Sequence, residues 1–239
     1  MLIVKILLIS FVGSLLSLDR ILVQAMISRP IVLAPVIGLI LGNPYAGLVI
    51  GAFLELFWID RVPIGIYIPP NDSIACVFAA SLAILAGQAL GDVSKELIAL
   101  SVLLAIPFGI MAKKFDVKMM QANNTLSDQA LEDARSGNIR AIERKIWVGL
   151  GRMFLLYLLV LLVLQMVFIP SVIWLYPKLP SAFYTMLALI YYFLPLLGIA
   201  VALNSIKLRA AIPVFCAIFL ILAAAMDIRR KDMLAKAYL

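Results

Sequence analysis

Residues 29–72 decide the fold, and they read RPIVLAPVIGLILGNPYAGLVIGAFLELFWIDRVPIGIYIPPND. This stretch contains two apolar runs, 30–42 and 47–59, of only 13 residues each. A helix rises about 1.5 Å per residue, so a bilayer span needs about 20 apolar residues. Both runs are therefore too short to cross a membrane. The Asn43-Pro44 turn between them predicts a hairpin of two half-helices.

The chain as a whole is far more apolar than a soluble protein. Of its 239 residues 65% are hydrophobic and only 14% are charged, and the mean hydropathy is +1.12. An average soluble domain is about 45–50% apolar and about 25% charged. A soluble chain of this length could not bury so much apolar surface. The composition therefore predicts an all-α, polytopic membrane protein, since the strand alternation of a membrane barrel is absent.

The hydropathy pattern outside residues 29–72 predicts a single membrane domain over residues 1–239, in three parts. The first part, 2–112, holds full spans and the half-helices. Residues 113–145 carry seven Lys/Arg and five Asp/Glu, which favours a cytoplasmic loop. The third part, 146–239, holds the C-terminal spans and a basic tail. The predicted apolar segments are residues 2–18, 73–90, 96–112, 146–169, 181–203 and 210–226. Three full spans would put the polar stretch and the basic tail on opposite sides of the membrane, so either one of the last three segments is a re-entrant hairpin or half-span, or the positive-inside rule fails at one end.

Two of these segments carry further local signals. Residues 2–18 have the features of a signal peptide, but the membranous chain that follows favours an uncleaved first helix. In the polar stretch, Ser127 is a candidate helix N-cap and Gly137-Asn138 a helix break. We therefore expect a solvated loop with helical character in its middle.

The absence of histidine excludes several kinds of chemistry. The chain can supply no histidine general base, Ser-His-Asp triad, haem ligand or phosphohistidine. Cys76 and Cys216 lie far apart inside apolar runs, so we interpret them as buried small hydrophobes. We expect no catalytic residue, no metal and no cofactor. The net charge of +7 reflects the Lys/Arg bias of cytoplasmic loops, not a nucleic-acid partner.

A second irregular stretch, residues 63–72 (PIGIYIPPND), predicts a binding site. Its prolines and glycine prevent a regular helix. Irregular backbone at membrane depth is tolerated only when it is buried in protein or lines a wet cavity. Its free amides and carbonyls, with Asn71 and Asp72, suit a neutral polar ligand such as a sugar, whose hydroxyls need donors and acceptors. Broken hydrophobic segments also mark the binding sites of transporters.

Three other polar residues complete the predicted substrate site. Glu55 lies inside an apolar half-helix, where a carboxylate costs several kcal/mol unless it is paired, protonated or hydrated. It is either a ligand-binding group or a structural carboxylate that caps backbone amides. Gln88, on the following helix, and Gln24, before the first half-helix, could face the same cavity. The predicted site residues are Glu55, Asn71, Asp72, Gln88 and Gln24.

The glycines of the decisive stretch follow a packing pattern. Gly38 and Gly42, and Gly47 and Gly51, form two GxxxG spacings that flank the Asn43 turn. Glycines four residues apart leave a smooth stripe on a helix, which lets another backbone approach closely. Helix packing and a sliding or hinge surface are both compatible with this pattern.

These residues resemble the enzyme IIC subunit of the mannose/fructose/sorbose family of the phosphoenolpyruvate-dependent sugar phosphotransferase system. That family has an Arg-Pro, a glycine-rich turn, a G-x-x-x-(Q/E) helix and an I-G-x-x-x-P segment. Asn43 replaces the Asp that is usual in the turn, and Asn71-Asp72 replaces a single Asp after the proline. The matching residues are Arg29-Pro30, Gly38 to Gly42, Gly47, Gly51, Glu55, Ile64-Gly65 and Pro70.

The resemblance implies a sugar permease in the bacterial inner (plasma) membrane, not a phosphoryl-transfer enzyme. Its implied partners are a membrane IID subunit and the soluble IIB and IIA phosphocarriers, with the lipid bilayer around it and an oligomer as the assembled form. Translocation in this family is described as an elevator-like movement. The lack of histidine in this chain agrees independently with phosphate being carried by other subunits.

Two other functions are compatible with the sequence. An ion-coupled secondary transporter would use Glu55 and Asp72 as coupling carboxylates. A non-transporting membrane assembly subunit would use the same polar residues only for structure. Uptake that survives loss of phosphoenolpyruvate but collapses with an uncoupler would indicate the first. Alanine variants that lose stability without losing uptake would indicate the second.

Overall fold

The computed structural model describes residues 2–61, 67–205, 213, 216–217 and 220. The part 62–66 of the irregular stretch, most of the last predicted span, 210–226, and the basic tail, 227–239, lie outside the described residues.

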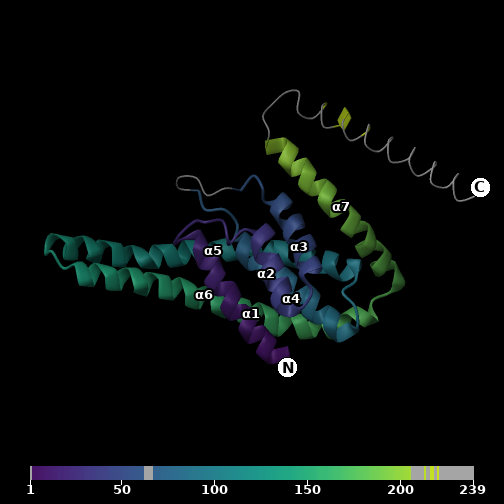
Figure 1. Ribbon diagram of the computed structural model, residues 1–239, viewed down its shortest axis with the longest axis horizontal. Helices are drawn as coiled ribbons and strands as arrows, with labels where there is room; N and C mark the ends of the chain where they lie inside the picture. Colours follow the sequence, from purple (N-terminus) through teal and green to yellow (C-terminus); the bar gives the residue numbers. More distant parts are fainter. Residues whose placement is uncertain (1, 62–66, 206–212, 214–215, 218–219, 221–239) are drawn as a thin grey trace, which may run out of the picture.

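The described part of the chain is helical and contains no strand, as the sequence predicts (Figure 1). The half-helices predicted around Asn43 are present, and the other described α-helices are longer. The elements are α1 (Leu2–Ser17), η1 (Leu18–Arg20), α2 (Pro30–Leu41), α3 (Pro44–Phe57), α4 (Asp72–Leu90), α5 (Lys95–Arg135), α6 (Ile139–Leu175), η2 (Tyr176–Lys178) and α7 (Ser181–Ser205).

Local signals set the ends of the α2–α3 hairpin. Pro30 occupies the first turn of α2, where its missing N–H costs nothing. Gly42 ends α2 with φ +82°, a left-handed conformation that favours glycine. The Asn43 side chain then accepts a 3.0 Å hydrogen bond from the Ala46 amide and caps α3. With 12 and 14 residues, α2 and α3 are about 18 and 21 Å long, shorter than the roughly 30 Å of bilayer hydrocarbon.

Three glycines of the two GxxxG spacings, Gly38, Gly47 and Gly51, pack α2 directly against α3. A Cβ atom added to Gly47 would lie 2.4 Å from the Ala34 carbonyl oxygen, and one added to Gly51 would lie 2.5 Å from that of Pro30. Side chains larger than hydrogen would therefore force the two backbones apart. Of the two interpretations of the glycine pattern, the structure supports helix packing inside the hairpin.

Helix α4 forms the core of the molecule. Every residue from Asp72 to Gly87 is buried, and α1, α2, α3, α5 and α6 all pack around this helix. Asn71 caps its first turn by accepting from the Ile74 amide, and Gly91 ends it with φ +103°. The core position of α4 places its N-terminal residues, Asn71 and Asp72, at the junction of several other helix ends.

The polar stretch 113–145 is helical, which corrects the prediction of a loop. α5 continues without a break to Arg135, and α6 begins at Ile139, so the two helices form one long hairpin that projects from the bundle (Figure 1). Ser127 lies inside α5 and is not an N-cap. The predicted break is confirmed: Gly137 has φ +71°, and the Asn138 side chain caps α6.

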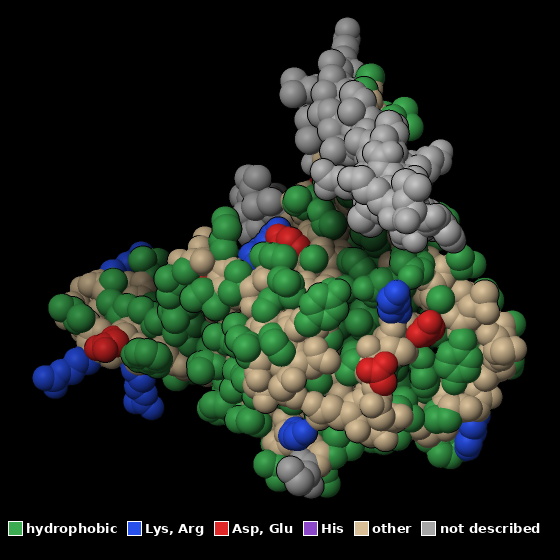
Figure 2. Space-filling model, turned by 45° about the vertical axis from the view of Figure 1, so that its right-hand side comes forward, with side chains coloured by type: hydrophobic (Ala, Val, Ile, Leu, Met, Phe, Trp, Pro, Cys, Tyr) green, Lys and Arg blue, Asp and Glu red, His purple; other side chains and the backbone are tan. Residues whose placement is uncertain are grey.

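Five described helical segments are long and apolar enough to cross a bilayer. Figure 2 shows a face of the molecule with an extensive apolar surface and few charged side chains. The chain is therefore a multi-pass membrane protein. The segments are Leu2–Arg20, Asp72–Leu90, Lys95–Arg135, Ile139–Lys178 and Ser181–Asn204.

Candidate functional site

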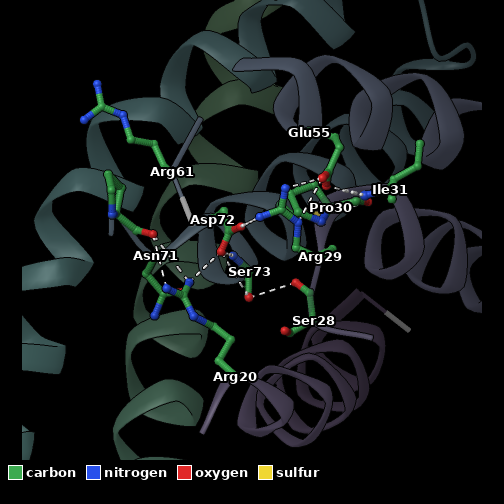
Figure 3. A network of polar contacts seen from close by, with 12 residues as sticks. Arg20, Ser28, Arg29, Pro30, Ile31, Glu55, Arg61, Asn71, Asp72 and Ser73 are labelled. Carbon is green, nitrogen blue, oxygen red and sulfur yellow. Dashed lines mark hydrogen bonds and ion pairs between the residues drawn. The ribbon is translucent and has the colours of Figure 1, made fainter. Parts of the chain in front are cut away.

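Four charged side chains meet where the ends of α1, α2, α3 and α4 converge (Figure 3). Arg20 lies in η1 after α1, and Arg29 is the N-cap residue of α2. Glu55 lies in the last turn of α3, and Asp72 is the first residue of α4. We call these four residues the arginine–carboxylate cluster.

Each carboxylate of the cluster is paired with an arginine. Arg20 Nη1 lies 2.5 Å from Asp72 Oδ1, and Arg29 Nη1 lies 3.9 Å from Asp72 Oδ2. Arg29 also pairs with Glu55, to which its Nε donates a 2.9 Å hydrogen bond. Arg29 therefore bridges the two carboxylates, one from the last turn of α3 and the other from the first turn of α4.

Backbone groups occupy other oxygens of the cluster. Asp72 Oδ1 accepts a 2.9 Å hydrogen bond from the Ser73 amide, and Glu55 Oε2 accepts a 3.3 Å bond from the Ile31 amide. Both amides belong to first turns of helices, where N–H groups lack partners within the helix. The partial positive charge of a helix N-terminus further favours these carboxylates. The bond from the Ile31 amide is what the second interpretation of Glu55, a structural carboxylate that caps backbone amides, requires.

The cluster remains partly accessible. The side chains of Arg29 and Glu55 are 21% and 18% exposed, and those of Arg20 and Asp72 are 15% and 11% exposed. Paired charges in such a partly buried place avoid the large desolvation cost of isolated ones. Their accessible edges offer N–H donors and carboxylate acceptors side by side.

Asn71 connects the cluster to the protein interior. Its Oδ1 accepts from the Ile74 amide at 3.0 Å and from Arg20 Nη1 at 3.2 Å. Its Nδ2 donates to Asp116 Oδ2 at 2.9 Å. Asn71 is fully buried, and both ends of its amide bond to protein groups.

The structure brings three of the five predicted site residues together and places two elsewhere. Glu55, Asn71 and Asp72 lie at the same junction. Gln88 follows Asp72 by sixteen residues on α4, a rise of about 24 Å, and bonds there to Lys5 Nζ and the Leu41 carbonyl. Gln24 is exposed in the loop after η1, with φ +57°.

The arginines are the partners that the sequence prediction of the site missed. Between Lys5 and Arg61 the sequence contains no cations other than Arg20 and Arg29. A carboxylate at membrane depth requires a partner, so these two residues were the natural candidates. Ser28 and Ser73, whose hydroxyl–carbonyl bond of 2.9 Å joins the α2 and α4 ends, gave no such signal.

A second ion pair lies beside the junction, after α3. Arg61 Nε lies 3.2 Å from Asp60 Oδ1, and its Nη1 donates a 3.2 Å hydrogen bond to the Tyr67 hydroxyl. The hydrogen bond to Tyr67 and the neighbouring Asp60 charge raise the pKa of the Arg61 guanidinium. Half of the Arg61 side chain is exposed, so solvent screens this pair more than the cluster.

The site supplies hydrogen bonds and fixed charges rather than metal coordination. Among the residues that the structure describes, no group of three or more His, Cys, Asp or Glu side chains could hold a metal ion. Cys76, which lies one helical turn after Asp72, is buried and contacts the Pro30 carbonyl at 3.7 Å. The fold and site together define a helical membrane protein whose polar centre is built from the ends of broken helices, an architecture typical of transporters.

The chain belongs to the family described as the sorbose-specific IIC component of the phosphotransferase system (PTS), whose profile matches residues 3–236. This match confirms the resemblance found in residues 29–72.

Several relatives share this family. The fructose permease IIC component of Bacillus subtilis (strain 168) is 24% identical over 139 residues, which is 58% of this chain and 49% of that protein. The PTS system mannose-specific EIIC component of Escherichia coli (strain K12) is 24% identical over 151 residues, 63% of this chain and 53% of that protein. The sorbose-specific EIIC component of Lacticaseibacillus casei is 26% identical over 145 residues, 61% and 48% of the two chains. The chain thus spans about half the length of the curated relatives it matches.

Two solved structures share the fold. One, titled "Structure of membrane protein", has a TM-score of 0.71 at 20% identity and covers 97% of this chain and 92% of that one. The other is the mannose transporter ManYZ in complex with microcin E492, with a TM-score of 0.60 at 20% identity, 93% of this chain and 86% of that one. At this identity the two structures establish the fold alone.

Proposed function

We propose that this chain is the sugar-translocating permease subunit of a phosphotransferase system, and that a hexose or hexose derivative binds at the arginine–carboxylate cluster. The observation that carries the proposal is the pairing of Arg20 and Arg29 with Asp72 and Glu55 at the ends of broken helices. The permease role is supported by the family description and by two relatives, which are named as IIC components and, in one case, as a permease.

The cluster has the chemistry that a sugar requires. Each sugar hydroxyl both donates and accepts hydrogen bonds, so its site needs both kinds of group within a few ångströms. At Arg29 and Glu55, the more exposed pair, the N–H groups of Arg29 that do not bond to Glu55 and the remaining lone pairs of the Glu55 oxygens would supply donors and acceptors at one edge. Hydrogen bonds to charged groups are stronger than neutral ones, which compensates for desolvating the hydroxyls.

The phosphoryl transfer step belongs to partners in this proposal. The chain contains no histidine, so it cannot carry a phosphohistidine. A membrane IID subunit would complete the sugar pathway, and soluble IIB and IIA proteins would deliver phosphate on the cytoplasmic side of a bacterial inner membrane. The assembled form is an oligomer, as in the sequence prediction.

The direct test is sugar-dependent thermal stabilisation of this chain purified with its IID partner, across a panel of hexoses, amino sugars and N-acetyl derivatives. A sugar at 100 times its Kd stabilises the folded state by about 2.7 kcal/mol, which a melting curve resolves. Asp72→Asn, which removes the charge that holds Arg20, is expected to lose the sugar-dependent shift. Gln88→Leu, at the far end of the same helix, is the matched control and should retain it. A panel in which no sugar shifts the wild-type curve would refute the proposal.

Uptake measurements separate group translocation from ion coupling. In membrane vesicles we expect sugar uptake to require phosphoenolpyruvate and to persist after the proton gradient is collapsed. Uptake with the opposite pattern would assign Glu55 and Asp72 to an ion-coupled transporter instead.

A further inference from the structure

Asp116 is a buried carboxylate outside the arginine–carboxylate cluster, and the proposed function does not use it. It lies on α5 at the root of the hairpin, where that helix still contacts Asn71 at the start of α4, and only 5% of its surface is exposed. Its chain neighbours on α5 are the more accessible Lys113, Lys114 and Lys118. Burying a carboxylate is costly unless specific partners receive it, so its partners indicate what it does.

Those partners come from two other helices. Asp116 Oδ2 accepts the 2.9 Å hydrogen bond from Asn71 Nδ2 at the start of α4. Asp116 Oδ1 has no hydrogen-bond partner among the described residues, and the almost fully buried Tyr157 phenol of α6 lies close enough to the carboxylate for an electrostatic interaction. The Asn71 backbone amide also donates to the Gly109 carbonyl of α5 at 2.9 Å. The α5 helix therefore holds Asn71, the residue that caps α4, through both its side chain and its backbone.

The identity of the group at position 116 determines which way the Asn71 amide points. A carboxylate accepts hydrogen bonds and cannot donate them, so it attracts the Nδ2 end of Asn71. This leaves Oδ1 to face the Ile74 amide and Arg20 Nη1, which are both donors. A reversed amide would place N–H groups against these two donors and lose all three bonds. Asp116 thus fixes the acceptor that helps to hold Arg20 beside Asp72.

We propose that Asp116 is a positioning residue for the sugar site: by orienting the Asn71 side chain it holds Arg20 and the N-terminus of α4 in the geometry that receives the sugar. The inference rests on the proposed function. It adds that the site is aligned by the root of the α5–α6 hairpin, through a residue that does not touch the sugar. Tyr157 supports the Asp116 side chain from α6.

A charge-swap cycle tests this role: Asp116→Asn, Asn71→Asp, and both together. Asn71→Asp places two carboxylates in contact, and we expect the sugar concentration for half-maximal uptake (KM) to rise about tenfold or more. Asp116→Asn exchanges a charge-assisted bond for a neutral one and should raise KM severalfold. The double variant remakes the bond in reverse, because asparagine at 116 donates to a carboxylate at 71. An aspartate at 71 still caps α4 and still accepts from Arg20, so KM should return to within about threefold of wild type.

The control variant is Asn123→Ala, which lies further out on the same hairpin. Asn123 Nδ2 on α5 donates a 3.4 Å hydrogen bond to the Gly149 carbonyl on α6, so the alanine variant also removes a polar link between these helices. We expect its KM to match that of wild type. If Asp116→Asn lowers only the amount of folded protein and leaves KM unchanged, or if the swap does not recover KM, the positioning role is refuted.

Melting temperatures of the same variants without sugar separate this inference from the proposed function. The Asn71–Asp116 bond joins two protein side chains, so each single variant should melt lower and the swap should recover most of the loss. A wild-type protein that transports no sugar but shows this recovery would refute the proposed function and retain the Asn71–Asp116 link. A swap that melts no higher than the single variants would refute the inference by itself.

Discussion

Gly47→Ala provides the sharpest test of how the α2–α3 hairpin is held together. The added methyl carbon would lie 2.4 Å from the Ala34 carbonyl oxygen and 3.1 Å from Gly38 Cα. Ordinary van der Waals contact begins near 3.4 Å, so the two helices must separate by about 1 Å at this level. Both obstacles are backbone atoms, which cannot turn aside as the end of a flexible side chain can.

The magnitude follows from two opposing terms. Overpacking a tightly packed contact costs about 1–3 kcal/mol, and the upper half of that range applies to contacts with backbone. Alanine in place of glycine inside a helix gains about 1 kcal/mol. The net loss is therefore about 1–2 kcal/mol, or a melting temperature lower by roughly 2–8 °C for a chain of this size.

Gly149→Ala is the matched control, because it offers the same gain without the collision. Gly149 also lies inside a helix, α6, but the nearest atom to an added Cβ is Asn123 Nδ2 at 3.7 Å, an ordinary contact. We expect this variant to melt at or above the wild-type temperature. Thermal unfolding of the detergent-purified proteins, followed by tryptophan fluorescence, measures both. Equal shifts in the two variants would show that the glycine contacts do not set the packing of the hairpin.

Three other sets of variants have defined expectations in the same thermal unfolding assay. Gln165 is fully buried in α6, and neither end of its side-chain amide is hydrogen-bonded to a described residue, so Gln165→Leu should stabilise the protein by about 1–3 kcal/mol. Gln88→Leu loses two hydrogen bonds and should destabilise the protein. Arg29→Met leaves Glu55 without its cation and should lower the free energy of unfolding by about 2 kcal/mol or more. Adding Glu55→Met should recover part of that loss, and a double variant that melts lower than the single variant would contradict the pairing. Gln24→Gly should melt up to a few degrees higher with uptake unchanged, because φ +57° favours glycine, and a loss of uptake would return Gln24 to the site.

The α2–α3 hairpin of half-helices was predictable because the length of each apolar run decides whether it can span a bilayer. Thirteen apolar residues cannot cross a bilayer whatever surrounds them, and the Asn43-Pro44 turn leaves few alternatives. The polar stretch 113–145 shows the limit of composition, since charged residues are compatible with a solvated helix as well as with a loop. No proline or glycine occurs between Lys113 and Arg135. α5 therefore continues until Gly137 ends the first arm of the hairpin.

The site was only partly predictable, for a physical reason. The cost of burying a carboxylate identifies Glu55 and Asp72 from sequence, but it does not identify the cation that pairs with each one. Arg20 and Arg29 are separated from these acids by 26 to 52 positions and meet them only through the packing of four helix ends. Gln88 illustrates the opposite error. It shares α4 with Asp72, yet sixteen residues of helix place it near the other end of the span.

The composition of the arginine–carboxylate cluster also determines how it responds to voltage. Two guanidinium groups and two carboxylates sum to zero, and a neutral sugar adds nothing. One elementary charge moved through 100 mV changes in free energy by about 2.3 kcal/mol, so a cluster with a single unpaired charge would be pulled toward one side of an energised membrane. Because each acid is matched by an arginine, the membrane potential exerts no net force on these four groups taken together. Under the proposed function, binding a neutral sugar would leave this balance unchanged, so moving the loaded cluster would require little electrical work.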